Sequence, residues 1–204
     1  MFLQYRLGFL GCLLLLMITD STMAQKWINL FNGKDLTGWH IMPGGEWKVE
    51  NGVIAGTSPA SENRHGLLVY DKQFSDFEIE IEYKAIKGNS GLYFRSEKVN
   101  NEVGVYGFQA EIDDEKDAGG LYETGGRAWV VQPTADQVKT WYKPGAWNTM
   151  KIRAVGKDIT VWVNGKESAR LTNDAGRTNG YIALQLHGDM EMEVYFRKVR
   201  IQPL

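Results

Sequence analysis

Residues 77–83 read Phe77-Glu78-Ile79-Glu80-Ile81-Glu82-Tyr83, and this stretch decides the fold class. Its apolar side chains alternate one by one with glutamates. Successive side chains of a strand point to opposite faces of a sheet, so the alternation predicts a strand with one buried and one solvated face. We assign no function to the glutamates, because the outer side of a half-exposed sheet normally carries solvated charges.

Related patterns recur along the chain. Lys48–Ile54 and Val161–Lys166 each place Asn-Gly between β-forming residues, which predicts two hairpins. Residues 190–201 continue the alternation, with a bulge expected near Arg197-Lys198. Only Ala135–Tyr142 is expected to form a short helix, because no segment shows a sustained helical stripe. About ten to twelve short strands predict an all-β protein, either an antiparallel two-sheet sandwich or a closed barrel, and we expect the sandwich.

The first 24 residues have the pattern of a signal peptide. Arg6 supplies a positive start, Leu7–Ile18 form an apolar run too short to span a bilayer, and Thr22-Met23-Ala24 ends in a small residue. A retained N-terminal anchor is the alternative, and Cys12 lacks the lipobox that lipidation requires. We therefore expect cleavage after Ala24, one domain over residues 25–204, and a secreted or periplasmic protein.

Charge and cysteine content exclude other classes of protein. A net charge of −2 with intermixed acids and bases leaves no basic surface for nucleic acid or anionic lipid. Cys12 is the single cysteine and lies in the predicted signal peptide, so the mature domain is expected to fold without disulfides. The seven Trp and nine Tyr residues can fill a sandwich core or stack on sugar rings.

Three predicted strands carry large hydrogen-bonding side chains opposite their apolar face. Because alternate side chains of a strand share a face, Tyr93 is expected beside Arg95, and Gln185 beside His187. By the same rule Gln109, Glu111 and Asp113 share one face. If these strands are neighbours in one sheet, the side chains converge on a surface that suits a ligand with many hydroxyl groups.

These polar residues also admit simpler interpretations. Glu111 and Asp113 lie roughly 6.5–7 Å apart along a strand and can divide acid and base roles or bind a cation, but Asp113 could equally cap a turn. Arg95 could form a structural ion pair with Glu111, and His187 could merely hydrogen-bond a neighbour. His40 and His65 have weaker claims, because they fall in apparent loops.

The segment 117–131 is rich in glycine and is a second candidate for the site. It places Tyr122, Glu123, Arg127 and Trp129 around four glycines, and such loops commonly line binding sites. The alternative is a surface hairpin in which Trp129 covers the core edge. The chain has no Gly-x-Ser-x-Gly elbow, His-Glu-x-x-His helix or phosphate loop, which disfavours acyl transfer by a nucleophile and zinc hydrolysis.

The chain resembles the secreted 3-keto-disaccharide hydrolase family in segments that follow one another along nearly the whole mature sequence. The segments are Trp27–Trp39, Asn89–Arg95, Gly107–Asp114, Trp147–Ile152, Ile159–Gly165, Leu184–Gly188 and Phe196–Ile201. The resemblance implies a jelly-roll sandwich of the concanavalin A-like lectin/glucanase type and action on glycosides oxidised at C3.

That activity implies a base, a stabiliser of an enolate and an acid for the leaving group, because a ketone at C3 acidifies the proton on C2. We expect Glu111 or His187 to be the base and Arg95 to stabilise the enolate, helped by Gln185. Asp113 would orient the sugar or hold a metal ion, and a two-carboxylate glycosidase mechanism stays open. Other substrate-binding residues are expected to be Tyr93, Gln109, Tyr122, Glu123, Arg127 and Trp129.

The main alternative is a non-catalytic, lectin-type carbohydrate-binding module, since jelly rolls host binding proteins as readily as enzymes. A surface module without a small ligand is the third possibility. The expected partner is an oxidised glycoside, with no cofactor, no nucleic acid and no membrane after signal removal. The sequence leaves the oligomeric state, the aglycone and the linkage open.

Overall fold

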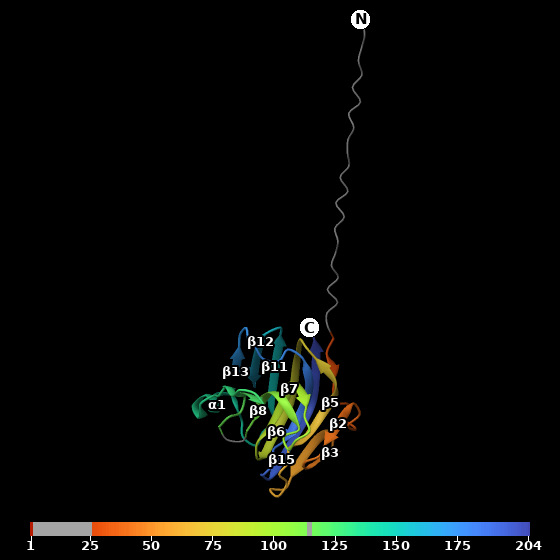
Figure 1. The fold of residues 1–204 in the computed structure, drawn as a ribbon, viewed down its shortest axis with the longest axis vertical. Coiled ribbons are helices and arrows are strands. Elements are labelled where there is room, and N and C mark those ends of the chain that lie inside the picture. Colours follow the sequence, from red (N-terminus) through yellow and green to blue (C-terminus); the bar gives the residue numbers. More distant parts are fainter. Residues whose placement is uncertain (2–25, 114–115) are drawn as a thin grey trace.

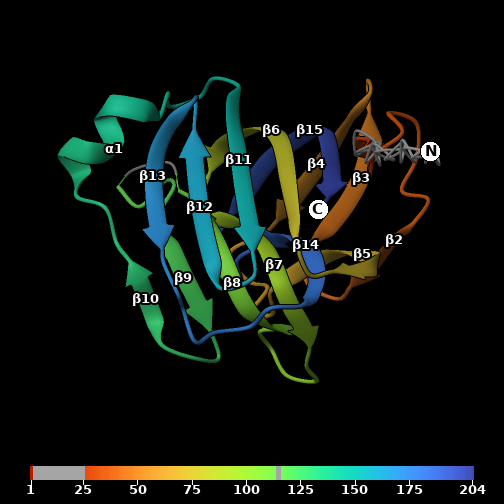
Figure 2. The ribbon, with the colours of Figure 1, turned by 90° about the horizontal axis from the view of Figure 1, so that it is seen from above.

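The computed structural model describes Met1, residues 26–113 and residues 116–204 (Figure 1). The predicted signal peptide therefore lies outside the described residues except for Met1. Two antiparallel sheets make up the fold, and Figure 2 shows their strands in two rows. The predicted two-sheet, jelly-roll-like sandwich is confirmed.

The first sheet contains the strand on which the fold prediction rests. Its strands, in spatial order, are β13 (Lys166–Leu171), β12 (Asp158–Val163), β11 (Asn148–Val155), β6 (Phe77–Lys87), β15 (Met192–Pro203), β4 (Val53–Ser58) and β3 (Glu46–Glu50), with β1 (Ile28–Asn29) paired to β15.

The second sheet carries the polar side chains singled out above. Its order is β10 (Ala128–Val131), β9 (Leu121–Thr124), β8 (Val105–Ile112), β7 (Ser90–Lys98), β14 (Gly180–Leu186), β5 (Gly66–Phe74) and β2 (Trp39–Met42).

Strand β6 shows the predicted alternation. Phe77, Ile79 and Ile81 are fully buried between the sheets. Glu80 and Glu82 lie on the outer face, where they form ion pairs with basic side chains of β15. The solvated charged face is therefore the outside of the sandwich.

The predicted local features are confirmed as well. Asn51-Gly52 and Asn164-Gly165 turn the β3–β4 and β12–β13 hairpins, and all four residues have positive φ, as a type I′ turn requires. The expected bulge is a register shift between Arg197 and Arg200 in the pairing of β15 with β6.

The short helix expected near residue 135 is α1 (Ala135–Trp141). Thr134 and Gln137 form a capping box at its start. Figure 2 shows α1 beside β13, outside both sheets. No helix in the described part of the chain is both long and apolar enough to cross a membrane.

Apolar residues from both sheets form one main core, in which Phe94 of β7 stacks on Phe108 of β8 with ring centroids 5.5 Å apart. A smaller apolar cluster is separate from this core and contains Leu67, Val69, Tyr93, Val105 and Ala183. Tyr93 and Ala183 alternate with the core residues Leu92 and Leu184, so the smaller cluster lies on the outer face of the second sheet. The candidate site stands on this face.

Candidate active site

The three strands with polar outer faces are direct neighbours. The order β8–β7–β14 places the side chains of Gln109 and Glu111 on the same face as those of Tyr93 and Gln185. The expectation that these strands lie together in one sheet is therefore confirmed.

A cleft of about 460 Å³ opens on this face. Its lining is polar with an aromatic and apolar fringe: His65, Asn89, Tyr93, Val103, Gln109, Glu111, Asp113, Tyr122, Thr124, Trp129, Gln185, His187 and Met190. Eight of the side chains selected from the sequence are in this list: Tyr93, Gln109, Glu111, Asp113, Tyr122, Trp129, Gln185 and His187.

Gly91 of β7 gives the cleft its close-packed floor. A Cβ at this position would lie only 2.5 Å from Cγ of Gln109, so a larger residue would displace that side chain. The absence of a side chain lets the Gln109 amide reach both Glu111 on its own strand and Gln185 on β14.

Glu111 is the buried acidic group of the cleft, with only 5% of the residue exposed. Gln109 Nε2 donates to its Oε1 at 2.5 Å, and Asn89 Nδ2 donates to its Oε2 at 3.1 Å. Burial raises its pKa from the ordinary 4.5 to about 8, with smaller contributions from Asp113 and Asp117, while the two amide donors oppose the rise.

Asp113 lies beside Glu111 and shares a partner with it. Asn89 Nδ2 donates to Asp113 Oδ2 at 3.3 Å, and the backbone N–H of Lys116 donates to Oδ1 at 3.0 Å. The turn contact agrees with the expectation that Asp113 could cap a turn, and the Asn89 contact links it to the cleft.

Two histidines form one end of the cleft. His65 precedes β5 and His187 follows β14, and their ring centroids are 4.3 Å apart. Gln185 Nε2 lies 2.7 Å from His65 Nδ1, and His187 Nδ1 lies 2.6 Å from the carbonyl oxygen of Gly188. Burial, followed by the charge of His187, lowers the pKa of His65 to about 4, against the attraction of Asp189, so its ring is neutral at physiological pH.

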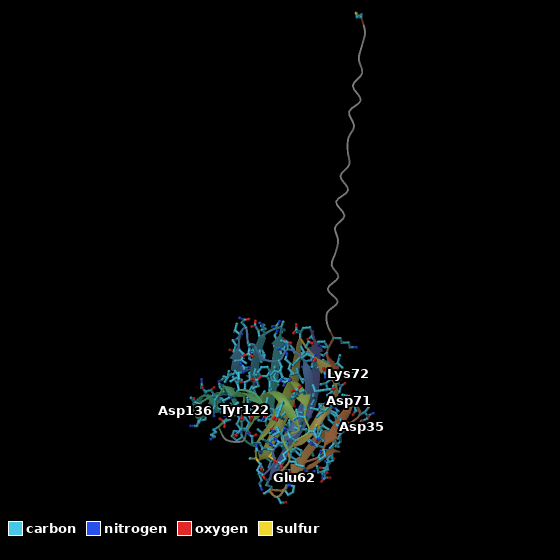
Figure 3. The ribbon with its side chains drawn as sticks, in the orientation of Figure 1. Asp35, Glu62, Asp71, Lys72, Tyr122 and Asp136 are labelled. Carbon is cyan, nitrogen blue, oxygen red and sulfur yellow. The ribbon has the colours of Figure 1, made fainter. Side chains whose placement is uncertain are left out.

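An aromatic corner forms the opposite end. Tyr122 of β9 and Trp129 of β10 pair across their strands and meet edge to face, with ring centroids 5.3 Å apart. Figure 3 shows Tyr122 on the side of the molecule that carries α1, away from Glu62 in the loop that leads to His65. The cleft therefore runs from a hydrogen-bonding end to an aromatic end.

Arg95 was expected in this cleft, and that prediction is wrong. A register shift between Phe94 and Glu97 and a positive φ of 47° at Arg95 break the alternation of β7. Its guanidinium is buried away from the cleft and donates to the carbonyl oxygens of Ser75, Gly156 and Arg177. One extra residue in a strand reverses which face the next side chain occupies, so Arg95 ties together loops at the end of the sandwich.

Glu123 and Arg127 are also absent from the cleft. Glu123 pairs in register with the core residue Phe108 and therefore lies on the face opposite Tyr122. Arg127 Nε donates to Glu123 Oε2 at 2.5 Å, and its NH1 and NH2 groups donate to Asp174 at 2.7 and 2.9 Å. The expected substrate-binding role is thus replaced by an ion-pair cluster at the sheet edge.

Sequence reasoning missed three polar lining residues, His65, Asn89 and Thr124. The antiparallel register brings Gly66 of β5 opposite Leu186 of β14, which sets His65 beside His187. Ser90 pairs with Ile112, which sets Asn89 beside Asp113. Only long-range strand pairing carries this information, because local alternation stops where each strand ends. Thr124 could have been selected from the sequence, because it lies two residues after Tyr122 on β9 and therefore faces the same side of the sheet.

A larger hollow, of about 640 Å³, lies on the outer face of the first sheet. Its carboxylates are already paired with cations, Glu80 with Arg200 and Glu82 with Arg197 and Lys198. A paired, solvated carboxylate makes a poor base, so we place the candidate active site in the smaller cleft. Within the described ranges, no three His, Cys, Asp or Glu side chains are arranged to hold a metal ion.

Comparisons with known proteins identify a related hydrolase and similar folds. A 3-keto-disaccharide hydrolase of Bacteroides thetaiotaomicron is 25% identical over 235 aligned residues, which cover 89% of this chain and 79% of the relative. A Parabacteroides distasonis protein, classed by inference as a glycosyl hydrolase, has a TM-score of 0.64 at 24% identity, covering 87% of this chain and 94% of its own. The carbohydrate-binding module CBM66 of Bacillus subtilis has a TM-score of 0.62 at 17% identity, covering 81% and 95%.

The fold is a β-sandwich, and the family match and the Bacteroides relative support a glycosidase or carbohydrate-binding role. More specifically, the chain belongs to the family of 3-keto-α-glucoside-1,2-lyase-like domains, whose model matches residues 26–202. The resemblance expected from the sequence motifs is confirmed by this match.

Proposed function

We propose that this protein is a glycoside hydrolase or lyase that acts on 3-keto-glycosides, with Glu111 as the general base. The observation that carries the proposal is the buried Glu111 carboxyl in the cleft, whose pKa burial raises to about 8. A general base works best when its pKa lies near the working pH. The family and the Bacteroides relative support an oxidised glycoside as the substrate class.

In the proposed reaction, the Glu111 carboxylate takes the proton from C2 and becomes a carboxylic acid. The C–H electron pair forms the C2–C3 double bond, and the C3 oxygen becomes an enolate. As the C3 carbonyl re-forms, the C1–C2 double bond forms and the bond from C1 to the aglycone oxygen breaks. That oxygen takes the electron pair and a proton, and we assign the proton to protonated Glu111. Addition of water across C1 and C2 completes net hydrolysis.

The two ends of the cleft indicate how the substrate lies. The oxidised sugar needs hydrogen-bond donors and acceptors, which the end with His65 and His187 provides. The aglycone then extends towards Tyr122 and Trp129, whose rings offer apolar faces for stacking.

A carbohydrate-binding module is the second candidate, and the likeness of the fold to CBM66 favours it. The cleft chemistry favours the enzyme. Burying a carboxyl such as Glu111 destabilises its ionised form, and binding a neutral sugar does not require that cost.

The test is turnover of a chromogenic 3-keto-glucoside beside the unoxidised glucoside, with wild type, Glu111→Gln and Glu123→Gln. Glu123 is the matched control, because it is a buried glutamate on the neighbouring strand that faces away from the cleft. We expect wild type and Glu123→Gln to cleave only the keto substrate, and Glu111→Gln to lose this activity. Sugar binding without cleavage of either substrate would refute the enzyme and favour the carbohydrate-binding module.

The proposal also includes export, with residues 1–24 as the signal peptide and residues 25–204 as the mature single domain. The family model begins at residue 26, two positions after Ala24, which supports the boundary. N-terminal sequencing of the exported protein should find Gln25 first, and a retained Met1 would contradict the proposal.

A further inference from the structure

The cleft side chains use most of their N–H donors on one another. Gln109 Nε2 donates to Glu111 Oε1 and to Gln185 Oε1, at 2.5 and 3.1 Å. Gln185 Nε2 lies 3.3 Å from Tyr93 Oη and 2.7 Å from His65 Nδ1. An amide nitrogen carries two hydrogens, so neither glutamine has an N–H left for a ligand. Asn89 Nδ2 is committed in the same way, to Glu111 and Asp113.

The hydroxyl groups of the cleft close this network. The single hydroxyl hydrogen of Thr124 is directed to Gln109 Oε1, so Tyr93 Oη accepts from Gln185 and donates to Thr124 Oγ1, 2.9 Å away. Thr124 then donates to Gln109 Oε1 at 3.4 Å. Each hydrogen in this circuit has one consistent position, and none of these hydroxyl hydrogens is left for a substrate.

The circuit determines the tautomer of His65. Its Nδ1 receives an N–H from Gln185 and must be unprotonated, so the hydrogen of the neutral ring is on Nε2. His187 has the opposite tautomer, because the Gly188 carbonyl can only accept and so requires the hydrogen on His187 Nδ1. In their neutral forms the adjacent rings therefore offer one free donor, His65 Nε2–H, and one free acceptor, His187 Nε2.

We propose that His65 is a catalytic residue, whose Nε2–H donates to the C3 carbonyl oxygen and stabilises the enolate that forms there. This inference rests on the proposed function and gives His65 the role that the sequence suggested for Arg95. Apart from the base Glu111 in its protonated form, the other uncommitted N–H and O–H donors among the described lining side chains are Trp129 Nε1 and Tyr122 Oη, at the aromatic end. Gln109 and Gln185 connect the base Glu111 to His65, which fixes their relative positions.

A neutral imidazole suits this role because it donates a hydrogen bond without surrendering its proton. Burial and the neighbouring His187 keep His65 uncharged, against the attraction of Asp189. The hydrogen bond strengthens as negative charge moves from C2 to the C3 oxygen, so it stabilises the transition state more than the ketone.

The first test reads the tautomer directly. The chain has three histidines, so two-dimensional ¹⁵N–¹H spectra of the labelled, full-length mature protein contain three imidazoles, which His40→Gln and His187→Gln variants assign. At neutral pH we expect His65 to be protonated on Nε2 only and the neutral form of His187 to carry its hydrogen on Nδ1. Protonation of His65 on Nδ1 would overturn the inference, whatever the activity of the protein.

The second test separates a catalytic role from a structural one. On the keto-glucoside, His65→Phe should lower kcat by roughly 100- to 1,000-fold, the usual effect of losing one oxyanion donor, with KM changed by less than about threefold. His65→Gln retains an N–H donor and should recover most of the lost kcat. His40→Phe, which changes an exposed histidine of β2, should match wild type.

The two proposals fail in different ways. Absence of keto-glucoside cleavage by wild type would refute the proposed function. Wild-type cleavage with His65→Phe retaining kcat within about threefold would refute the role of His65 alone. Equal losses in His65→Phe and His65→Gln would also overturn it, because a donor would then make no difference.

Discussion

Replacement of Glu111 by glutamine should make the protein more stable in alkaline solution and less stable in acid. Burial raises the pKa of Glu111 from 4.5 to about 8, so the folded state holds a proton that the unfolded chain has released between these pH values. The raised pKa stabilises the fold fully below pH 4.5, and this contribution is lost as the pH rises through about 8.

The magnitude follows from the size of the pKa change. At about 1.4 kcal/mol per pKa unit, the loss above pH 8 is roughly 4 to 5 kcal/mol as an upper bound. Glu111→Gln never ionises and escapes this loss. Its amide nitrogen is a donor and cannot accept, so either Gln109 or Asn89 loses its acceptor, and the lost hydrogen bond costs about 1 to 3 kcal/mol. The variant should therefore be more stable than wild type by about 2 kcal/mol at pH 9, and less stable by about 1 kcal/mol at pH 5.

The assay is urea unfolding of wild type and variant at both pH values, comparing free energies of unfolding. Glu82→Gln is the control. Burial acts to raise the pKa of Glu82, but the ion pairs with Lys198 and Arg197 outweigh it and lower that pKa. Loss of Glu82 should therefore destabilise the protein equally at pH 5 and pH 9. A Glu111→Gln difference that is the same at both pH values would refute the reasoning about burial.

Three further substitutions test how the cleft is built. Arg95→Met should lower the free energy of unfolding by about 3 kcal/mol, because several buried carbonyls lose their donor, while kcat of the folded protein stays near wild type; unchanged stability with lost activity would contradict the structural role. Trp129→Ala should raise KM roughly tenfold for keto-glucosides with aromatic aglycones and leave aliphatic ones little changed, and equal effects on both would place the aglycone elsewhere. Gly91→Ala should displace the Gln109 side chain and lower kcat by about 100-fold, as small misplacements in active sites do. Wild-type kinetics would show that the cleft accommodates the added methyl group without displacing Gln109.

The fold could be predicted from the sequence because its signals are local. The alternation in Phe77–Tyr83 and the Asn-Gly turns depend only on neighbouring residues, and β6 and both hairpins follow them. The same period placed Gln109, Glu111 and Gln185 on one face correctly, since their strands are regular where these residues stand.

The rest of the site depends on irregular or long-range features. A bulge in β7 turned Arg95 away from the cleft, and alternation cannot foresee where a strand gains an extra residue. His65 is 122 positions from His187, and only the pairing of β5 with β14 makes them neighbours. The composition of the glycine-rich stretch does not show which side chains share a face. In the structure, Tyr122 of β9 lies in the cleft and Glu123 lies on the opposite face of the sheet.

The most direct test of the central claim is the fate of the hydrogen on C2 during cleavage. A 3-keto-glucoside carrying deuterium at C2 should release its aglycone from the wild-type protein more slowly than the unlabelled compound, and the deuterium should be lost to solvent. Both results follow if Glu111 removes that hydrogen. Equal rates for the two compounds, with deuterium retained on C2 of the product, would show direct hydrolysis at C1 and contradict proton abstraction by the cleft.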